Sequence, residues 1–410
     1  MKNRTVAVIG MGYIGLPTAL MMASHGINVV GVDYNEQLIN TLNAGKTTFK
    51  EKGLDELFDS AVNSGIVFTT KYPVTDLYIV SVPTPYDKES KKIDPLYVVK
   101  AVETVLSVCS DNSIIVVEST ISPGTIDKFI RPIVKNQQKH IELVHAPERI
   151  IPGNMVYELL NNNRTIGSDS KEIGELVKSY YSSFCKGEIV ITDIKTAEMT
   201  KVVENTFRAV NIAFANELAK ICDSDGMNVY EIIKICNMHP RVNILQPGPG
   251  VGGHCISVDP WFLVGDYPDL TKVIGASMDV NASMPTYVIN KMSDIIKENN
   301  LDINRIGIYG LTYKENVDDV RESPTLQLLE HQEIEMVRKL KAFDPWVEKS
   351  IVNNQYHDFD KFLDNVDAVI VMAKHKHIID NVSKIRNKII FDTCNIINDE
   401  TIKKYKLWKK

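Results

Sequence analysis

Short runs of β-branched and aliphatic residues alternate with longer amphipathic stretches through the first half of the chain. Runs of this kind predict buried strands, and the stretches between them predict helices. Strands that alternate with helices favour a parallel, doubly wound sheet with helices on both faces. The predicted strands of this first set are residues 6–10, 28–33, 77–82, 113–118, 141–145 and 189–192.

A second α/β set follows near the C-terminus. Its pattern repeats that of the first set, and a strand that ends in Val-Met-Ala-Lys occupies the place that Val-Ser-Val-Pro holds earlier. The sequence therefore predicts an α/β protein with two Rossmann-like doubly wound domains. The predicted strands of the second set are residues 305–310, 341–344, 367–372 and 388–392.

The segment between the two sets, residues 193–225, contains neither glycine nor proline. Its apolar residues recur at helical spacing, which predicts one long helix. Thr192 or Asp193 is a suitable N-cap, and Gly226 follows the end. We expect this helix to join the two sheets and to build a homodimer or higher homo-oligomer interface. Its apolar positions include Met199, Val202, Val203, Val210, Phe214, Leu218 and Ile221.

Composition narrows the classes of function. The chain has 410 residues, enough for two or three domains, and its formal charge of −6 comes from intermixed acids and bases. That mixture argues against nucleic acid or an anionic membrane as a partner. Six cysteines without a C-x-x-C pair suggest neither a zinc site nor a disulfide framework, and they favour a reducing cytoplasm. No apolar stretch reaches the roughly 18 residues that a transmembrane helix needs.

A glycine pattern, Gly-Met-Gly-Tyr-Ile-Gly, directly follows the first predicted strand and opens a helix. In this context the first glycine allows a tight turn, the second lets a pyrophosphate approach, and the third packs helix against strand. Asp33 ends the second strand, where a carboxylate can bind an adenosine ribose and repel a 2′-phosphate. The pattern predicts NAD rather than NADP. The cofactor residues predicted here are Gly10, Gly12, Tyr13, Ile14, Gly15 and Asp33.

Two threonines, Thr84 and Thr120, follow later strand ends. Open α/β sheets place their ligands at such ends, so both are candidates to lie near the nicotinamide. The alternative is that they are ordinary turn or capping residues.

Cys255 lies in a loop, residues 246–259, that is too rich in glycine and proline to be regular structure. A thiol there can attack an aldehyde, and loss of hydride from the adduct gives a thioester that water hydrolyses to an acid. The glycines, Gly252 among them, let backbone approach a substrate. The alternative is a buried, inert cysteine. We interpret the neighbouring His254 as structural.

Four polar residues, Glu198, Lys201, Asn205 and Arg208, recur three or four positions apart along the predicted long helix and so share one stripe. A polar stripe is usually solvated. Lysine and asparagine could instead both donate hydrogen bonds to a developing oxyanion.

Glu148 follows another strand end and could activate a water for thioester hydrolysis. Its alternative is a salt bridge with Arg149. The imidazoles of His375 and His377 have no carboxylate or thiol partner at a recognisable spacing, so we expect no metal site. Cationic and polar residues near predicted loops that could hold a diphosphate or a sugar carboxylate are His239, Arg241, Tyr313, Lys314 and Arg321.

Together these segments resemble the UDP-glucose/GDP-mannose dehydrogenase family over nearly the whole chain, from the glycine pattern to residues 313–324, Tyr-Lys-Glu-Asn-Val-Asp-Asp-Val-Arg-Glu-Ser-Pro. The resemblance implies an NAD-dependent, four-electron oxidation of the C6 alcohol of a UDP-sugar through a thiohemiacetal and a thioester. It implies Cys255 as nucleophile, Lys201 and Asn205 beside it, and Glu148 in hydrolysis. Further roles that it implies are a catalytic water held by Thr120 and Asp259, a cofactor contact by Arg321, and substrate contacts by Lys314, Arg241, Arg208 and His239.

Departures from the glucose-oxidising branch point to another sugar. Its Pro-Glu-Phe-Leu-x-Glu segment is replaced here by residues 147–153, Pro-Glu-Arg-Ile-Ile-Pro-Gly, and the lysine before its loop aspartate is Val258. The sequence looks most like the branch that oxidises UDP-N-acetyl-D-mannosamine for surface polysaccharides such as capsule. Arg149 and Ile150 would then offer donors beside an apolar contact for an acetamido group.

These expectations combine into three segments: an NAD-binding domain, residues 1–192; a central helical and catalytic-loop region, residues 193–298; and a UDP-sugar-binding domain, residues 299–410. Alternatives are the oxidation of UDP-N-acetylglucosamine, a two-electron β-hydroxyacid dehydrogenase, and an NAD-sensing protein without turnover. The third segment and Cys255 argue against the β-hydroxyacid enzyme. The set of Lys201, Asn205 and Cys255 would be unexplained in a sensor.

Overall fold

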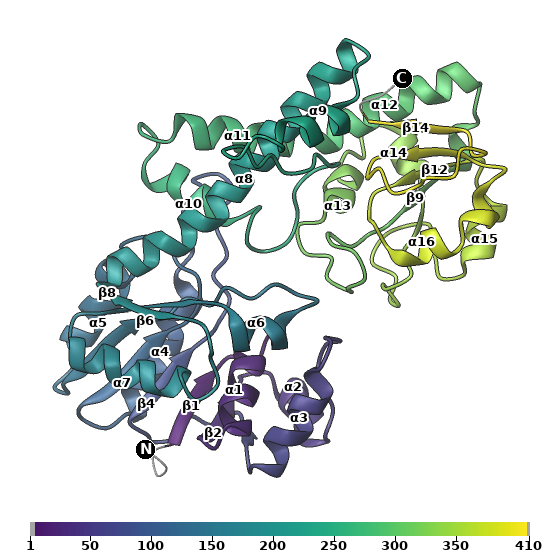
Figure 1. Ribbon diagram of the computed structural model, residues 1–410. Helices are drawn as coiled ribbons and strands as arrows, with labels where there is room; N and C mark the ends of the chain where they lie inside the picture. The colour runs from purple at the N-terminus through teal and green to yellow at the C-terminus, as the bar shows by residue number, and fades with distance from the viewer. Residues whose placement is uncertain (1–4, 408–410) are drawn as a thin grey trace. The chain divides into compact units, whose positions relative to one another are not determined.

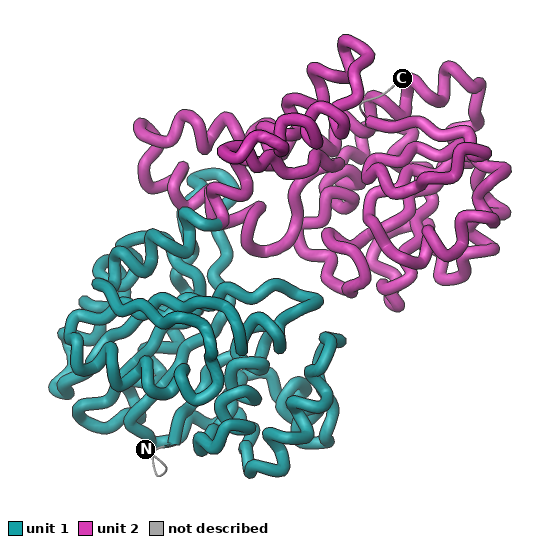
Figure 2. Tube along the Cα trace, viewed as in Figure 1, with its two compact units in different colours: residues 1–204 teal, residues 205–410 magenta. Residues whose placement is uncertain are grey.

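The computed structural model describes residues 5–407, which form two compact units (Figure 2). The division falls between Glu204 and Asn205, inside helix α8 (Ile194–Ser224). One continuous helix therefore contributes to both units. The expected division into three domains stays a prediction, since compactness alone groups the chain in two.

The first unit is built on an eight-stranded sheet in the order β3-β2-β1-β4-β5-β6-β7-β8 (Figure 1). The expected doubly wound sheet is confirmed, with the strand order reversing between β1 and β4. The sheet is not wholly parallel, however, because β6 and β7 pair antiparallel. Its strands are β1 (Thr5–Ile9), β2 (Asn28–Val32), β3 (Val67–Thr69), β4 (Leu77–Val80), β5 (Ser113–Val117), β6 (Ile141–His145), β7 (Arg164–Ser168) and β8 (Ile189–Thr192).

Helices of the first unit start where side chains can satisfy the free backbone N–H groups. Asn35 accepts from the N–H of Leu38 at 3.2 Å to cap α2, and Ser170 accepts from the N–H of Ile173 at 3.3 Å to cap α7. The helices are α1 (Gly15–Ser24), α2 (Glu36–Asn43), α3 (Leu54–Asn63), α4 (Leu96–Val108), the π-helical turn η1 (Ile126–Ile130), α5 (Arg131–Lys135), α6 (Met155–Asn161) and α7 (Lys171–Tyr181).

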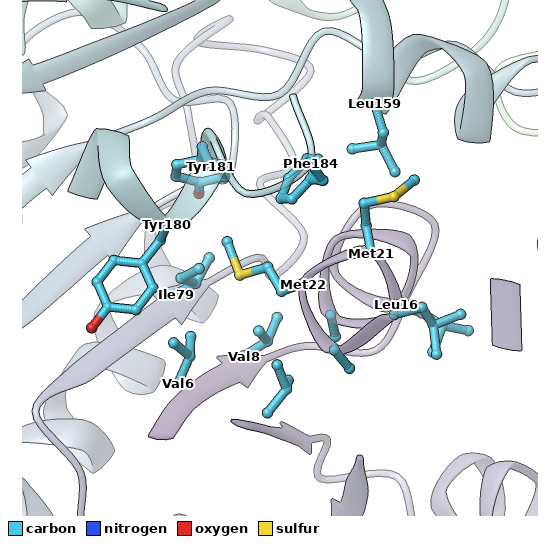
Figure 3. Close-up of a cluster of buried hydrophobic side chains, with 14 of the residues drawn as sticks. Val6, Val8, Leu16, Met21, Met22, Ile79, Leu159, Tyr180, Tyr181 and Phe184 are labelled. Carbon is cyan, nitrogen blue, oxygen red and sulfur yellow. The ribbon is translucent and has the colours of Figure 1, made fainter. Parts of the chain in front are cut away.

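A buried cluster fixes helix α1 against the sheet (Figure 3). Val6 and Val8 of β1 lie beside Met22 of α1, and Tyr181 and Phe184 pack edge to face with ring centroids 6.1 Å apart. Full burial of each such side chain stabilises the fold by roughly 1.5–3 kcal/mol. The cluster therefore also fixes the turn that joins β1 to α1.

The second unit has a six-stranded, wholly parallel sheet in the order β11-β10-β9-β12-β13-β14. This order repeats that of the first six strands of the first unit, as the two similar sequence patterns predicted. Here the order reverses between β9 and β12. The strands are β9 (Ile306–Tyr309), β10 (Lys341–Phe343), β11 (Gln355–Tyr356), β12 (Ala368–Val371), β13 (Ile389–Asp392) and β14 (Lys404–Lys406).

Helices precede, connect and cover this sheet (Figure 1). A helical group lies between α8 and the first strand, and shorter helices link the later strands. They are α9 (Val229–Cys236), α10 (Asp259–Asp266), α11 (Lys272–Ala282), α12 (Met284–Asn299), the 3₁₀ turn η2 (Ile303–Arg305), α13 (Pro324–Leu329), α14 (Glu335–Lys339), α15 (Phe359–Asp364), α16 (Lys376–Asp380) and the 3₁₀ turn η3 (Val382–Ile385).

Helix α8 confirms the predicted long helix, but the exposure of its side chains departs from a simple amphipathic pattern. Glu198 on the predicted polar stripe is only 1% exposed, and Lys201 is also buried. Phe207 is 66% exposed, and Phe214 and Ile221 are half exposed. No helix within residues 5–407, α8 included, is long and apolar enough to span a bilayer.

Candidate active site

Each of the three glycines in the turn between β1 and α1 is suited to its position for a different physical reason. Gly10 has φ +96°, and an added Cβ there would overlap the carbonyl oxygen of Ser81. A Cβ on Gly15 would overlap the carbonyl oxygen of Gly10, so α1 can approach β1 only with glycine there. At Gly12 an added Cβ meets nothing within 4 Å, so this position opens to the space where a pyrophosphate would lie. The turn therefore fits a dinucleotide.

Asp33 follows the end of β2 and binds the turn itself. Its Oδ2 accepts from the N–H of Met11 at 2.8 Å, and its Oδ1 accepts from the N–H of Asn35 at 2.9 Å. Each carboxylate oxygen has a further lone pair that can accept from a ribose hydroxyl. Its role at the adenosine ribose stays a prediction.

Thr84 and Thr120 follow the ends of the neighbouring strands β4 and β5, and the structure brings them together. The Thr84 hydroxyl donates to the carbonyl of Thr120 at 2.6 Å, and Thr84 is buried. The Ser119 hydroxyl accepts from the N–H of Val82 at 2.9 Å and donates to the Val82 carbonyl at 2.7 Å. These bonds hold the two strand ends in a fixed relation.

Glu148, just beyond β6, is buried and does not pair with its neighbour's guanidinium. Its Oε2 pairs with Arg164, and its Oε1 accepts the N–H of Arg149 at 2.7 Å. The Arg149 guanidinium instead donates to Thr165 Oγ1 at 2.8 Å and pairs with Glu204 at 2.8 Å. The Glu148–Arg149 salt bridge considered as the alternative is therefore wrong, and Arg164 is the partner that sequence reasoning missed.

A second buried carboxyl group, Glu118, lies on the other side of Arg164. Its Oε1 is 4.0 Å from the guanidinium and accepts from the Tyr181 hydroxyl at 3.1 Å. Burial, and then the negative charge of Glu148, raises the pKa of Glu118 to about 8. Glu118 therefore carries a proton at neutral pH, and the positive charge of Arg164 is left to Glu148.

The pair predicted to contact an acetamido group divides between surface and core. Ile150 is 4% exposed and belongs to the apolar core of the first unit. Arg149 has one buried donor, its Nε, without a hydrogen-bond partner. The substrate role of Arg149 and Ile150 stays a prediction.

The polar stripe on α8 is buried along Glu198, Lys201 and Asn205 rather than solvated. Glu198 accepts from the N–H groups of Gly124 and Ile126 at 2.5 and 2.9 Å, which assigns it to the start of η1. Burial raises the pKa of Glu198 to about 7. The stripe thus combines a structural carboxyl group with the two predicted oxyanion donors.

In the second unit, Asn205 Nδ2 donates to Asp259 Oδ2 at 2.6 Å, and both side chains are buried. Asp259 opens helix α10, and its N–H donates to the carbonyl of Cys255 at 2.8 Å. Cys255 itself is exposed. An exposed thiol excludes the buried, inert cysteine considered as its alternative.

The loop of Cys255 packs tightly on the loop that follows β9. A Cβ added at Gly252 would lie 2.6 Å from the carbonyl oxygen of Glu322 and 2.6 Å from the Tyr313 Cβ. The N–H of Gly253 donates to the Arg321 carbonyl at 2.9 Å. Glycine is needed at Gly252 for this close approach. The predicted nucleophile and several predicted substrate residues therefore belong to one packed pair of loops.

Other predicted substrate residues lie at the surface of the second unit. Arg208, His239 and Arg241 are exposed, and the N–H of Arg241 donates to His239 Nδ1 at 3.3 Å. The Arg321 guanidinium binds both oxygens of Asp319, at 2.9 and 2.6 Å. Their substrate and cofactor roles stay predictions.

Three sequence models of one family match the chain in order. They describe the NAD binding domain of the UDP-glucose/GDP-mannose dehydrogenase family at residues 4–185, its central domain at residues 195–283, and its UDP binding domain at residues 307–399. The chain belongs to this family. It is accordingly an NAD-dependent dehydrogenase, and the family's UDP binding domain contains Tyr313, Lys314 and Arg321. A sensor without turnover is thereby disfavoured.

Full-length relatives agree with this assignment. The chain is 43% identical to UDP-N-acetyl-D-mannosamine dehydrogenase of Methanococcus maripaludis, over 99% of this chain and 95% of that protein. The solved UDP-N-acetyl-mannosamine dehydrogenase of Staphylococcus aureus is 40% identical with a TM-score of 0.88, covering 98% of each chain. The corresponding structure from Pyrococcus horikoshii is 33% identical with a TM-score of 0.90, covering 99% of each chain.

Replacing Asp33 by serine should relax the preference of this dehydrogenase for NAD, because the carboxylate that would repel a 2′-phosphate is removed. The ratio of kcat/KM for NADP to that for NAD should rise about tenfold or more, as steady-state kinetics with each cofactor would measure. Asp59→Ser, an exposed acid on α3, is the control. An unchanged ratio in Asp33→Ser would assign the choice of cofactor to another residue.

Replacing Glu118 by glutamine should change how stability depends on pH. The raised pKa means that the folded protein keeps a proton that the unfolded chain releases between the ordinary value of 4.5 and about 8. This contribution to stability is therefore complete below about pH 4.5 and is lost as pH rises towards about 8. The urea midpoint of Glu118→Gln, relative to that of the wild type, should therefore rise as the pH is raised across this interval.

The matched control for this measurement is Glu103→Gln, an exposed carboxyl group on α4 of the same unit. Its midpoint should run parallel to that of the wild type across the same pH range. Parallel curves for Glu118→Gln as well would mean that Glu118 is ionised in the folded protein.

Proposed function

We propose that this enzyme oxidises the C6 alcohol of UDP-N-acetyl-D-mannosamine to the carboxylate, with Cys255 as nucleophile. The observation that carries the proposal is the exposed Cys255 on a glycine loop that packs against the loop of Tyr313 and Arg321 in the family's UDP binding domain. A thiol so placed has a fixed relation to the part of the protein that would hold the UDP group. The names of the full-length relatives support the choice of sugar.

The reaction proceeds in four steps. The C6 alcohol loses a hydride and a proton and becomes an aldehyde. The Cys255 thiolate adds to the aldehyde carbon, forming a C–S bond, and the oxygen takes a proton to give a thiohemiacetal. Loss of a second hydride from that carbon and of the hydroxyl proton gives a thioester. Water then breaks the C–S bond, which releases the carboxylate and two protons and regenerates the Cys255 thiolate. Bound NAD supplies the hydride acceptor in each oxidation.

Charge develops on the sugar oxygen in these steps, and buried donors on α8 are suited to stabilise it. Lys201 and Asn205 lie one helical turn apart, so both can direct hydrogen atoms to one oxygen. Asn205 is oriented by its bond to Asp259, which uses one of its two amide hydrogens. The second amide hydrogen is the one that we assign to the substrate.

Hydrolysis needs a base for the attacking water, and we assign this role to Glu148. For Thr120 and Asp259 we retain the role in holding a catalytic water that the family resemblance implies. Arg164 pairs with Glu148 Oε2 and so fixes the direction in which this carboxyl group faces. An ionised carboxylate can accept the proton of the water.

The selectivity for an N-acetyl group is assigned to Arg149 with Ile150. The unpartnered Nε of Arg149 is a donor that an amide carbonyl can satisfy. Ile150 would act by anchoring this segment in the core rather than by a wide apolar contact, because its side chain is buried there.

We also propose that the enzyme is a homodimer or a higher homo-oligomer that pairs through α8. Phe207, Phe214 and Ile221 are exposed and follow one another at intervals of seven residues, the repeat of helices that pack along a shared seam. The cytoplasmic location is likewise part of this proposal.

The central test is stoichiometry. One UDP-sugar consumed should reduce two NAD, because an alcohol loses four electrons on the way to a carboxylate and each NAD accepts two. Absorbance of the reduced cofactor, compared with the acid quantified by chromatography, measures the ratio. Cys255→Ser should fail to form the acid, whereas Cys236→Ser, a control on α9, should keep the ratio of two. A wild-type ratio of one would leave a two-electron dehydrogenase, and full acid formation by Cys255→Ser would remove the covalent step.

The identity of the sugar is tested by a substrate panel. UDP-N-acetylmannosamine should give the highest kcat/KM. UDP-glucose should give almost none, because it leaves the donor that pairs with the amide unsatisfied. UDP-N-acetylglucosamine carries the amide at the opposite configuration, so a directional contact should give it a far lower value. A panel led by UDP-N-acetylglucosamine would favour the alternative epimer. One led by UDP-glucose would refute the assigned N-acetyl selectivity and leave the four-electron chemistry intact.

A further inference from the structure

His375, which the sequence offered only as half of a rejected metal motif, is wholly buried at the switch point of the second sheet. It follows β12, while Thr312 follows β9 and Asp344 follows β10. The imidazole Nε2 is 3.1 Å from Thr312 Oγ1 and 3.2 Å from Asp344 Oδ2. Three neighbouring strand ends are thus joined through one ring.

The hydrogen bonds determine which ring nitrogen carries the hydrogen atom. Nδ1 accepts from the N–H of Asn316 at 2.9 Å, and a backbone N–H can only donate. The Thr312 hydroxyl donates its hydrogen to the carbonyl of Lys314 at 2.9 Å, so its oxygen accepts a hydrogen bond from the ring. Nε2–H therefore donates to Thr312 and Asp344, and Nδ1 is the acceptor.

Asp344 has the charge and the contacts to maintain this arrangement. Its Oδ2 also accepts the N–H of Leu311 at 2.6 Å, and its Oδ1 accepts the N–H of Trp346 at 2.7 Å. Burial alone would raise the pKa of Asp344, but the bonds from His375 and the backbone outweigh it and lower the pKa below the usual value. An ionised Asp344 accepts only, so it requires a hydrogen on Nε2.

The ring binds a segment whose backbone is left-handed at one residue. Asn316 has φ +58°, in the left-handed region, and its Oδ1 accepts the N–H of Lys376 at 3.0 Å. Together with the bond that the Asn316 N–H donates to His375 Nδ1, this contact fixes Asn316 on one side of Lys314. On the other side, Thr312 binds the Lys314 carbonyl.

The same loop continues to the nucleophile. The N–H of Tyr313 donates to the Asp319 carbonyl at 3.1 Å, and Asp319 binds the Arg321 guanidinium. The Arg321 carbonyl accepts from Gly253, two residues before Cys255. A continuous series of contacts, all within the second unit, therefore links the ring to both the substrate loop and the cysteine loop.

We propose that His375 is a positioning residue that holds the loop of Tyr313 and Lys314 in the conformation that binds the UDP group of the substrate. The inference rests on the proposed function, because the substrate roles of Tyr313 and Lys314 belong to it. His375 acts through Asn316, which it binds with Nδ1. Asp344 keeps the hydrogen atom on Nε2, so that Nδ1 remains an acceptor. The residue touches neither substrate nor cofactor.

Two substitutions separate the two nitrogens. His375→Asn can place an amide oxygen near the position of Nδ1 and so keep an acceptor for the backbone N–H of Asn316. His375→Gln places its amide near the position of Nε2 and leaves the N–H of Asn316 without an acceptor. Loss of a buried bond of this kind should raise the KM for the UDP-sugar about tenfold in His375→Gln, with a smaller rise in His375→Asn. The KM for NAD should change less than the KM for the UDP-sugar in both variants, because Arg321, the predicted cofactor contact on this loop, is bound by Asp319 rather than by the ring.

Two further variants complete the design. In Asp344→Asn the amide can donate to Nε2 and so favour the opposite ring tautomer, and the KM for the UDP-sugar should rise as in His375→Gln. His377→Gln is the matched control, since His377 lies two residues away on α16 and its Nδ1 contacts Tyr309 rather than the loop. Its KM should match that of the wild type. Thermal melting and UDP affinity by calorimetry are measured for every variant.

The proposal is overturned if His375→Gln keeps the wild-type KM and UDP affinity. It is equally overturned if His375→Asn and His375→Gln lose UDP affinity alike and in proportion to melting temperature, because a purely structural role would do that. A wild type that oxidises no UDP-sugar would refute the proposed function instead. The UDP titrations would still decide the role of His375, since they need no turnover.

Discussion

Parallel strands direct all their carboxyl ends to one edge of a sheet, and both units of this protein depend on that constraint. In the first unit the glycine turn, Asp33, Thr84, Thr120 and Glu148 each follow a different strand, yet the sheet brings their positions to one edge. In the second unit Thr312, Asp344 and His375 meet in the same way. Side chains more than a hundred residues apart can thus share a site without any direct bond between them.

Buried charge imposes the next constraint. Arg164, Glu118 and Glu148 are almost wholly removed from water, and such burial is costly unless charges are matched. The molecule meets this cost with one guanidinium, one carboxylate and one protonated carboxyl group, and the Arg164 guanidinium also lies 4.6 Å from the centre of the Tyr181 ring. In the second unit, hydrogen bonds from the backbone and from His375 compensate the burial of the Asp344 carboxylate.

Periodicity and local motifs predicted most of the fold because they depend on neighbours along the chain. Most strands of both sheets, the span of α8 and the glycine turn belong to this class. Strands β3, β7, β11 and β14 were not predicted. In β7, Arg164, Thr165 and Ser168 give a polar pattern although all three are buried. The partner of Glu148 was missed because Arg164 is 16 residues away on strand β7 and no local sequence pattern connects the two. Likewise, the spacing of His375 and His377 shows nothing of Asp344, 31 residues earlier.

The continuity of α8 across the boundary between the units restricts how the gene can vary. An α-helix advances about 1.5 Å and turns about 100° with each residue. Inserting or deleting a single residue between Lys201 and Asn205 would therefore swing one side chain away from the other by more than a quarter of a turn. Surface loops absorb changes of length at little cost, but this stretch has no such freedom. In descendants of this chain, the length of α8 between these two residues should therefore remain constant.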